Sequence, residues 1–273
     1  MIVKAVTGGN GLVGSQFGPA YLKLGRKEAD FTLRDETVSL FERLRPDTVI
    51  HTAAKVGGLY SNLQSPADYF EQNLRINTNV LEACRLSRVK KMVGFLSTCI
   101  FPDTVDYPLT EEKIHLGPPH VSNYGYAYAK RMLEVGIEAH NQQYGTRYFC
   151  VIPTNIYGTN DNFNLADAHV IPALIHKVFI AREKKTALQI PGDGSALREF
   201  IFARDVANIV ENLLQKYEQT TPVIISSGVE ISIKQVLERI IELMNYKGKV
   251  EWQTNLTNGQ HLTTHVTGRW PAL

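Results

Sequence analysis

Cysteine is scarce in this chain, which has 3 among 273 residues. Cys84, Cys99 and Cys150 are odd in number and show no CxxC spacing, a pattern that argues against both a disulfide framework and a zinc site. Long apolar runs are also missing, because no stretch reaches the length of a membrane span and the first residues lack a signal-peptide pattern. We therefore expect a cytoplasmic protein without a metal site.

A dominant charge is absent as well. The 29 basic and 27 acidic residues are scattered and give a net charge of +2. Because a nucleic-acid partner requires clustered basic residues, this pattern argues against one. A hydrophobic fraction of 44% and a charged fraction of 21% are ordinary for a globular protein. The length favours one α/β domain with a smaller dependent lobe.

Short β-branched runs alternate with helical patterns in the first half of the chain, which is typical of βαβ units. They predict an α/β fold with a Rossmann-type, doubly wound parallel sheet over residues 1–155 and a smaller, mainly substrate-binding lobe over residues 156–273. Segment 222–226 is a candidate for a further strand of the main sheet. The strands are expected at 2–7, 48–54, 91–98 and 148–155, with more near 188 and 200, and the helices at 68–85, 124–143, 169–182, 205–217 and 232–245.

A glycine-rich turn follows the first expected strand, with glycines at positions 8, 11 and 14. Such glycines permit a tight turn and close approach to a pyrophosphate, and the helix that follows supplies N–H groups and a positive dipole end. A glycine-rich turn without a ligand is the alternative. Because segment 14–26 is short for a helix plus a strand, the first helix must be truncated. The predicted cofactor contacts in the turn are Gly8, Gly11, Leu12, Val13 and Gly14.

Two cations, Arg26 and Lys27, follow the second expected strand. They occupy the place where an acidic residue would otherwise bind a ribose 2′-hydroxyl, so they favour a 2′-phosphate and hence NADP(H). A solvated charged turn is the alternative. Asp30 looks like the residue that meets the adenine edge in extended short-chain dehydrogenases.

Tyr126 and Lys130 are four residues apart and therefore lie on one face of a helix. A lysine ammonium beside a phenol lowers the pKa of the phenol, which then exchanges a proton with a carbinol oxygen during hydride transfer. Ser97, at the end of an expected strand, completes a Ser/Tyr/Lys set. An isolated YxxxK motif would be a surface feature.

Several further motifs make the pattern specific. They are segment 97–102 (STCIFP), Asn123 with Tyr126 and Lys130, segment 153–158 (PTNIYG), segment 161–163 (DNF) and segment 169–172 (HVIP). With these motifs the chain resembles the GDP-L-fucose synthases, a family of extended short-chain dehydrogenases, from about residue 6 to 239. General short-chain dehydrogenases lack the Cys99 and His169 elements.

The resemblance implies 3,5-epimerisation of GDP-4-keto-6-deoxy-D-mannose followed by NADPH-dependent reduction at C4. It makes Cys99 the base, His169 the acid of the epimerisation, and Tyr126 the proton donor to the carbonyl oxygen. Lys130 then holds the nicotinamide ribose, and Ser97 stabilises the substrate oxygen. Cys99 as a small buried hydrophobe and His169 as a helix cap are the alternatives.

The resemblance also implies further contacts and a homodimer paired through a four-helix bundle. Pro191 stands where the family usually has a tryptophan, Asn258 stands where it has an aspartate, and segment 268–273 matches nothing in the family. We therefore expect a truncated or aberrant C-terminus. The cofactor contacts implied are Ala53, Ala54, Val56, Leu96, Tyr126, Lys130, Pro153, Asn155, Ile156 and His169, and the contacts to the GDP-sugar substrate are Asn155, Lys177, Arg198 and Asn258.

Two other functions remain open at this stage. One is a related nucleotide-sugar epimerase or dehydratase, against which Cys99 and His169 argue. The other is a non-catalytic NADP-binding protein left by truncation. Intact Ser97, Tyr126 and Lys130 count against this second alternative, whereas the aberrant C-terminus counts for it.

Overall fold

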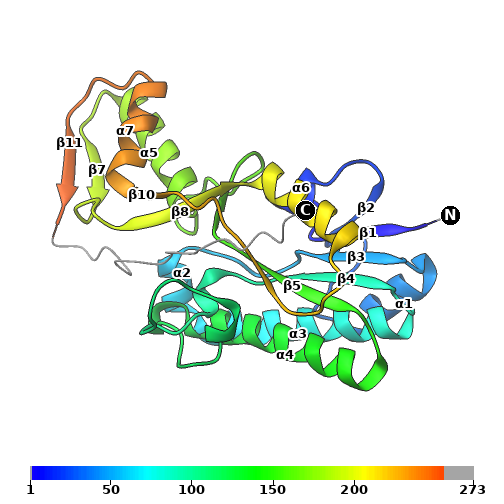
Figure 1. The fold of residues 1–273 in the computed structure, drawn as a ribbon. Coiled ribbons are helices and arrows are strands. Elements are labelled where there is room, and N and C mark those ends of the chain that lie inside the picture. The colour runs from blue at the N-terminus through cyan, green and yellow to red at the C-terminus, as the bar shows by residue number, and fades with distance from the viewer. Residues whose placement is uncertain (1, 255–273) are drawn as a thin grey trace.

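A six-stranded parallel sheet forms the centre of the molecule in the computed structural model, which describes residues 2–254 (Figure 1). The strand order is β2-β1-β3-β4-β5-β9, so the order reverses beside β1. Ligands of doubly wound folds bind at such a switch point, outside the carboxyl ends of the strands. The bounds are β1 Lys4–Thr7, β2 Tyr21–Leu24, β3 Thr48–His51, β4 Lys91–Phe95, β5 Tyr148–Pro153 and β9 Val223–Ile225.

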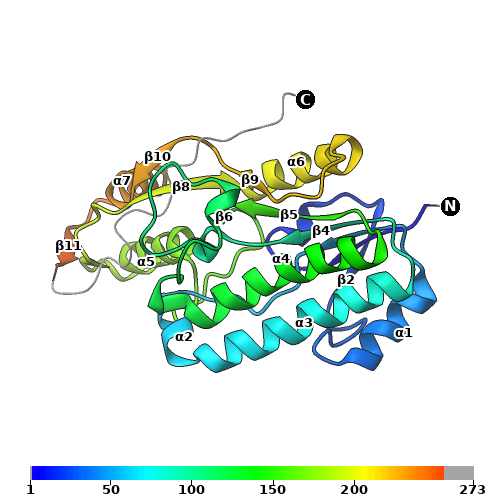
Figure 2. The same cartoon turned by 60° about the horizontal axis from the view of Figure 1, so that its bottom comes forward.

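Three helices cover one face of this sheet: α1 (Arg34–Leu44), α3 (Pro66–Leu86) and α4 (Tyr124–Tyr144). α3 and α4 run side by side along the molecule, and α1 lies next to α3 (Figure 2). Their apolar stripes bury a core with the inner face of the sheet, in which Val80, Leu133 and Met92 are fully covered. α2 (Leu59–Gln64) precedes α3.

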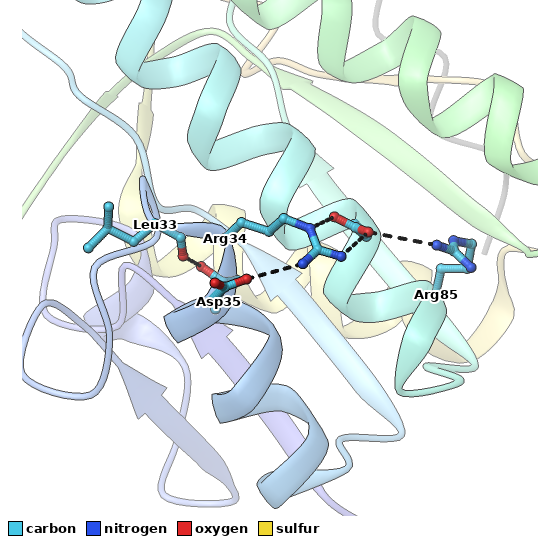
Figure 3. Close-up of polar contacts among 6 residues, drawn as sticks. Leu33, Arg34, Asp35 and Arg85 are labelled. Carbon is cyan, nitrogen blue, oxygen red and sulfur yellow. Dashed lines mark hydrogen bonds and ion pairs between the residues drawn. The ribbon is translucent and has the colours of Figure 1, made fainter.

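An ion-pair contact links the N-terminus of α1 to α3 (Figure 3). The Arg34 guanidinium donates Nε to Glu82 Oε2 at 2.8 Å and Nη2 to Glu82 Oε1 at 2.7 Å. Asp35, in the first turn of α1, lies 3.1 Å from Arg34, and Arg85 reaches Glu82 at 3.9 Å. Because Arg34 and Asp35 are exposed and Glu82 and Arg85 are only partly buried, the contact orients α1 more than it stabilises the fold.

The opposite face of the sheet is covered by α6 (Ala203–Lys216), which lies above the sheet in Figure 1. Val206, Val210 and Leu213 of α6 pack on Val6 and Phe149 of the sheet. Phe17 and Tyr21 extend the same core. α6 and β9 thus belong to the main sheet although they follow residue 155, and the strand expected in segment 222–226 is β9, paired with β5.

The first helix is even shorter than the sequence indicates. Only one 3-10 turn, Gly14–Gln16, separates the glycine-rich turn from β2. The expectation that a helix dipole supports the cofactor turn is therefore wrong, because a dipole needs several aligned peptide units. Two cations instead bind the carbonyl groups at the end of this turn. Lys23 Nζ donates to the carbonyls of Gly14 and Phe17, and Arg204 donates to the carbonyl of Gln16.

The remaining elements form a smaller lobe, at the left of Figure 1. α5 and α7 pack on the strand pair β7 and β11 around Leu174, Val178, Ile190 and Leu237. A second small sheet, β10-β8-β6, joins this lobe to the main body. The bounds are β6 Asn155–Tyr157, α5 Val170–Lys184, β7 Leu188–Pro191, β8 Leu197–Phe202, β10 Glu230–Ser232, α7 Ile233–Leu243 and β11 Val250–Gln253.

Two further findings concern the described chain as a whole. Within residues 2–254, no helix combines the length and the apolar character needed to cross a membrane. The same residues contain no group of three or more His, Cys, Asp or Glu side chains placed to hold a metal ion. Asn258 and segment 268–273 lie outside the described residues.

Candidate active site

The glycine-rich turn lies at the switch point of the sheet. Gly8 has a φ of +69°, and a Cβ there would lie 2.8 Å from the backbone nitrogen of Ala53. A Cβ on Gly14 would lie 2.2 Å from the Gly8 carbonyl oxygen, so both positions need glycine to close the turn. Gly11 is exposed, and a Cβ there would meet only the Gly8 oxygen, at 3.4 Å. Gly11 therefore leaves its backbone open to an incoming pyrophosphate, with Leu12 and Val13 half-buried beside it.

The two cations expected to select the cofactor lie on a tight turn after β2. Gly25 N donates to Glu28 Oε2 at 2.7 Å, and this contact holds the turn with Arg26 and Lys27 exposed at its tip. Asp30 Oδ1 accepts from Thr32 N at 2.9 Å and from Thr32 Oγ1 at 2.7 Å. These bonds from Thr32, together with the charge of Arg26, hold the pKa of Asp30 below its usual value.

The other predicted cofactor contacts lie at or just beyond the carboxyl ends of β3, β4 and β5. Ala53 is buried and Ala54 half-buried just after β3, whereas Val56 is 57% exposed. Leu96 and Pro153 are buried, and Ile156 is half-buried in β6. Because carboxyl ends of parallel strands share one edge, these residues lie on the same side of the sheet as the glycine-rich turn.

A buried polar chain links the glycine-rich turn to the helix that carries Tyr126 and Lys130. Thr7 Oγ1 lies 2.8 Å from His51 Nδ1, and His51 Nε2 lies 3.1 Å from Asn77 Oδ1. Asn77 Nδ2 donates to the carbonyl of Ala129 at 3.1 Å. Burial, reinforced by the charge of Lys130, lowers the pKa of His51 to about 3, so the ring is neutral. These hydrogen bonds thereby link four elements, β1, β3, α3 and α4, to one another.

Ser97, Cys99, Tyr126 and Lys130 come together where β4 ends against α4. Cys99 lies in the 3-10 turn Thr98–Ile100, which directly follows Ser97 and packs on α4. Lys130 is buried, its Nζ lies 5.8 Å from the centre of the Tyr126 ring, and it donates to the Phe95 carbonyl at 2.8 Å. The structure thus assembles the predicted Ser/Tyr/Lys set with Cys99 beside it.

The expected lowering of the Tyr126 pKa is not found in the chain by itself. Burial raises the pKa of Tyr126, and the neighbouring Cys99 and Tyr69 raise it further. The Lys130 ammonium donates its hydrogen bond to the Phe95 carbonyl and not to the phenol oxygen. Burial lowers the pKa of Lys130 to about 8. Tyr126 is accordingly held as a protonated phenol, the form that donates a proton.

Cys99 is a free thiol that is half-buried. Burial raises its pKa to about 11, an effect that Ser97, Lys130 and Arg131 partly offset. The thiolate is therefore the minor form at neutral pH, but it is a strong base when it forms. Cys84 and Cys150 are fully buried, and burial raises the pKa of each thiol further than that of Cys99.

His169 precedes the first turn of α5 and is exposed. Its side chain makes no capping hydrogen bond, which removes the helix-cap alternative. Gly58 N donates to the Asp167 carbonyl at 2.8 Å and so fastens the loop before His169 to the segment that follows β3. Burial raises the pKa of Asp161, and the nearby His169 partly offsets this rise.

Three candidate substrate residues lie in the lobe or at its junction with the main sheet. Lys177 on α5 and Arg198 on β8 are partly buried, and burial lowers the pKa of both. Asn155 Nδ2 donates to the Glu199 carbonyl at 2.9 Å, which joins β6 to β8. Lys and Arg donors of this kind suit a diphosphate. Pro191 ends β7.

Comparison with known proteins places this geometry in a family. A profile of the "NAD dependent epimerase/dehydratase family" matches residues 5–226. The GDP-L-fucose synthase of Dictyostelium discoideum is 45% identical over 95% of this chain and 85% of that protein. The chain belongs to the GDP-L-fucose synthase family. The probable GDP-L-fucose synthase of Drosophila melanogaster is 39% identical over 95% of this chain and 87% of that protein.

A solved structure agrees with this membership. The crystal structure of a GDP-L-fucose synthetase from Naegleria fowleri bound to NADP superimposes with a TM-score of 0.89 and 37% identity, and the match covers 96% of this chain and 84% of that one. This structural similarity includes both the main sheet and the lobe, since the match covers nearly the whole chain.

Two residues of the site escaped the sequence prediction. Tyr69 on α3 meets the Tyr126 ring edge-on at 6.4 Å, and its hydroxyl lies 2.7 Å from Ser61 Oγ. Arg131 is buried under the Cys99 turn. Helical spacing indicates that Tyr69 lies on the buried face of its helix. Arg131 follows Lys130 directly, and the sequence around it does not distinguish it from an ordinary pair of surface cations.

Proposed function

We propose that this chain synthesises GDP-L-fucose, by 3,5-epimerisation of GDP-4-keto-6-deoxy-D-mannose followed by NADPH-dependent reduction at C4. The observation that carries the proposal is the placement of Cys99 within the Ser97, Tyr126 and Lys130 cluster. A reductase alone needs only the latter three residues. A thiol beside them supplies the base that an epimerisation requires.

Epimerisation uses the acidity of the C–H bonds that flank a ketone. The Cys99 thiolate removes a proton from one such carbon, and the electron pair moves into an enolate whose oxygen faces Ser97 and Tyr126. His169 returns a proton to the opposite face of the same carbon. Its exposed ring, free of a capping role, suits a group that exchanges protons with solvent.

Reduction uses the protonated phenol of Tyr126. The bound NADPH supplies a hydride to C4 of the sugar. Tyr126 donates its proton to the carbonyl oxygen, Ser97 holds that oxygen in place, and Lys130 holds the cofactor ribose. The glycine-rich turn and the exposed pair Arg26 and Lys27 fit the pyrophosphate and the 2′-phosphate of the cofactor.

We propose that residues 1–155 hold the cofactor and that most of the remainder holds the substrate, with α6 and β9 returned to the main sheet. Lys177 and Arg198 bind the diphosphate of the GDP-sugar, and Asn155 lies at the junction of the two parts. The partial burial of both cations supports this role, since desolvated cations bind anions more strongly than surface ones.

The proposal is tested by mixing the purified chain with GDP-4-keto-6-deoxy-D-mannose and NADPH. We expect loss of NADPH absorbance and a product with L-fucose stereochemistry by NMR. NADPH binding without consumption would instead support a non-catalytic cofactor-binding protein. Consumption with a product that retains the configuration of the substrate at C3 and C5 would support a simple 4-reductase.

We also propose a homodimer formed through α3 and α4. The two helices present an exposed apolar groove of about 570 Å³, lined by residues of their N-terminal halves. Figure 2 shows both helices along one side of the molecule with no other element over them. Paired across a two-fold axis, they make a four-helix bundle. The groove is lined by Pro66, Ala67, Phe70, Tyr124, Gly125, Tyr128 and Met132.

We place this activity in the cytoplasm. The mechanism requires Cys99 as a thiol, and a reducing compartment keeps it in that form. All three cysteines of the chain are free.

A further inference from the structure

Arg131 ties the catalytic helix to the turn that carries Cys99. It follows Lys130 on α4, and its Nε donates to the carbonyl of Ile100 at 2.6 Å. Ile100 is the last residue of the 3-10 turn Thr98–Ile100. The guanidinium also lies over the Tyr128 ring, 5.3 Å from its centre. One side chain thus fixes the position of the turn against α4.

The guanidinium is buried without a matching carboxylate. Arg131 is 4% exposed, and its Nη2 has no hydrogen-bond partner among the described residues. No carboxylate within residues 2–254 forms an ion pair with it. A buried cation with an unsatisfied donor destabilises a fold, so such groups are rare unless an anion is expected nearby.

Cys99 is the group near Arg131 that becomes an anion in the reaction. A hydrogen bond from Ser97, the charge of Lys130 and, to a smaller extent, the charge of Arg131 favour the thiolate of Cys99. Tyr126 on α4 also interacts electrostatically with Cys99. Lys130 already donates to the Phe95 carbonyl, and its proposed partner is the cofactor ribose. Arg131 is the cation of the pair that has a side-chain nitrogen with no hydrogen-bond partner among the described residues.

We propose that Arg131 is a positioning residue for Cys99, which holds the Cys99 turn through Ile100 and favours the thiolate that removes the substrate proton. The inference rests on the proposed function, in which Cys99 is the epimerisation base. In this step one proton passes from a carbon beside the ketone to sulfur, the thiolate becomes a thiol, and the C–H electron pair moves into the enolate. Arg131 itself transfers no proton.

The test compares Arg131→Gln, which removes the charge but keeps a donor, with Arg131→Lys, which keeps the charge. Iodoacetamide alkylation of the free protein is followed against pH, and it reports Cys99 because Cys84 and Cys150 are fully buried. A Cys99→Ser variant gives the background. We expect the alkylation midpoint of Arg131→Gln to rise by about one pH unit, a tenfold change in thiolate population, and Arg131→Lys to stay near wild type. Arg75→Gln, an exposed cation on α3, is the matched control and should change nothing.

A second readout is incorporation of solvent deuterium into the keto sugar. Arg131→Gln should slow exchange about tenfold at neutral pH, whereas reduction of a keto sugar already epimerised at C3 and C5 should stay within about twofold of wild type. A purely structural role for Arg131 would lower both activities together. Equal losses for the Gln and Lys variants, or an unchanged alkylation midpoint in Arg131→Gln, would overturn the proposal.

The two readouts separate this inference from the function on which it rests. If Cys99 is not the base, deuterium exchange survives in Cys99→Ser, yet the alkylation midpoint still depends on Arg131. Thermal unfolding checks that each variant is folded. Should Arg131→Gln fail to fold, the Lys variant decides the matter, since the proposal requires it to keep wild-type alkylation and exchange.

Discussion

Cys99 and Tyr126 lie in one cluster but act in different steps, so single substitutions separate them. We expect Cys99→Ser to abolish incorporation of solvent deuterium into the keto sugar, because a serine hydroxyl is a far weaker base than a thiolate. Reduction of the ketone to an unepimerised 6-deoxy sugar should persist, since Ser97, Tyr126 and Lys130 remain. Mass spectrometry of the recovered sugar and NADPH absorbance give the two rates. Wild-type deuterium incorporation in this variant would return Cys99 to a packing role.

The opposite phenotype is expected for Tyr126→Phe. Without the phenol, the carbonyl oxygen loses its proton donor, and NADPH oxidation should fall by about two or more orders of magnitude. Deuterium exchange should continue, because Cys99 and His169 remain in place. The same two assays measure both rates. Normal ketone reduction by Tyr126→Phe would show that another group protonates the carbonyl oxygen.

Residue by residue, the site was predictable where a motif fixes it. Ser97, Tyr126, Lys130 and the glycine-rich turn were predicted from spacing, and Cys99 and His169 were predicted from the family resemblance. The burial of Arg131 was not predictable, because it depends on the turn that packs over α4. The rise of the Tyr126 pKa in the chain by itself was not predictable either, since no local pattern shows how completely the ring is desolvated.

At the scale of elements, the turn after β2 makes a specific prediction about cofactor choice. Replacing Arg26 and Lys27 together by serine should weaken NADPH binding by roughly 1 to 3 kcal/mol, the range expected when charge-assisted contacts to a phosphate are lost. NADH lacks that phosphate and serves as the internal control, so its affinity should change little. Fluorescence titration measures both. Equal losses for NADPH and NADH would refute the assignment of this turn.

The buried polar chain predicts how stability depends on pH. His51 has a pKa near 3 in the folded protein against 6.5 when unfolded, so only the unfolded chain takes up its proton between these values. The contribution of His51 to stability is therefore fully present above pH 6.5 and is lost as the pH drops below it, by about 1.4 kcal/mol per pH unit. Urea unfolding between pH 7 and 5 measures this slope. Carboxylates such as Asp47 contribute little there, because their titration begins at lower pH.

A substitution isolates the contribution of His51. His51→Gln cannot take up a proton, so its unfolding free energy should vary less with pH over the same range, although it is lower at pH 7. His115→Gln is the matched control, because His115 lies at the surface with 49% of its side chain exposed. If His51→Gln keeps the wild-type slope, the buried imidazole is not the group that titrates.

Most strands of the main sheet and the helices from α3 onward were predictable, whereas α1 and α2 were not. The strands β1, β3, β4 and β5 and the helices α3 and α4 follow clear periodicity. α1 was missed because its stripe buries only Thr37, Leu40 and Phe41 among charged neighbours. α2, with six residues, is too short for a periodic signal. The collapse of the first helix to a single turn follows from the few residues between Gly14 and β2.

For the whole molecule, the exposed groove on α3 and α4 predicts the oligomeric state. We expect a homodimer in equilibrium sedimentation at micromolar concentration. Phe70→Glu places a charge in the apolar groove and should shift the protein to a monomer. Leu243→Glu alters an exposed residue of α7 and should leave the dimer intact. A monomeric wild-type protein would contradict the four-helix bundle.

The main sheet is completed by a strand that arrives late in the chain. β5 pairs with β9, with Val151 opposite Val223. Much of the lobe lies between these two strands in the sequence. During synthesis the edge of β5 therefore emerges long before its partner, and α6 reaches the opposite face of the sheet only shortly before β9. An unpaired edge strand is a site of aggregation. We therefore expect the edge of β5 to be prone to aggregation until β9 pairs with it, and we expect the closure of this long-range pair to be a slow step of folding.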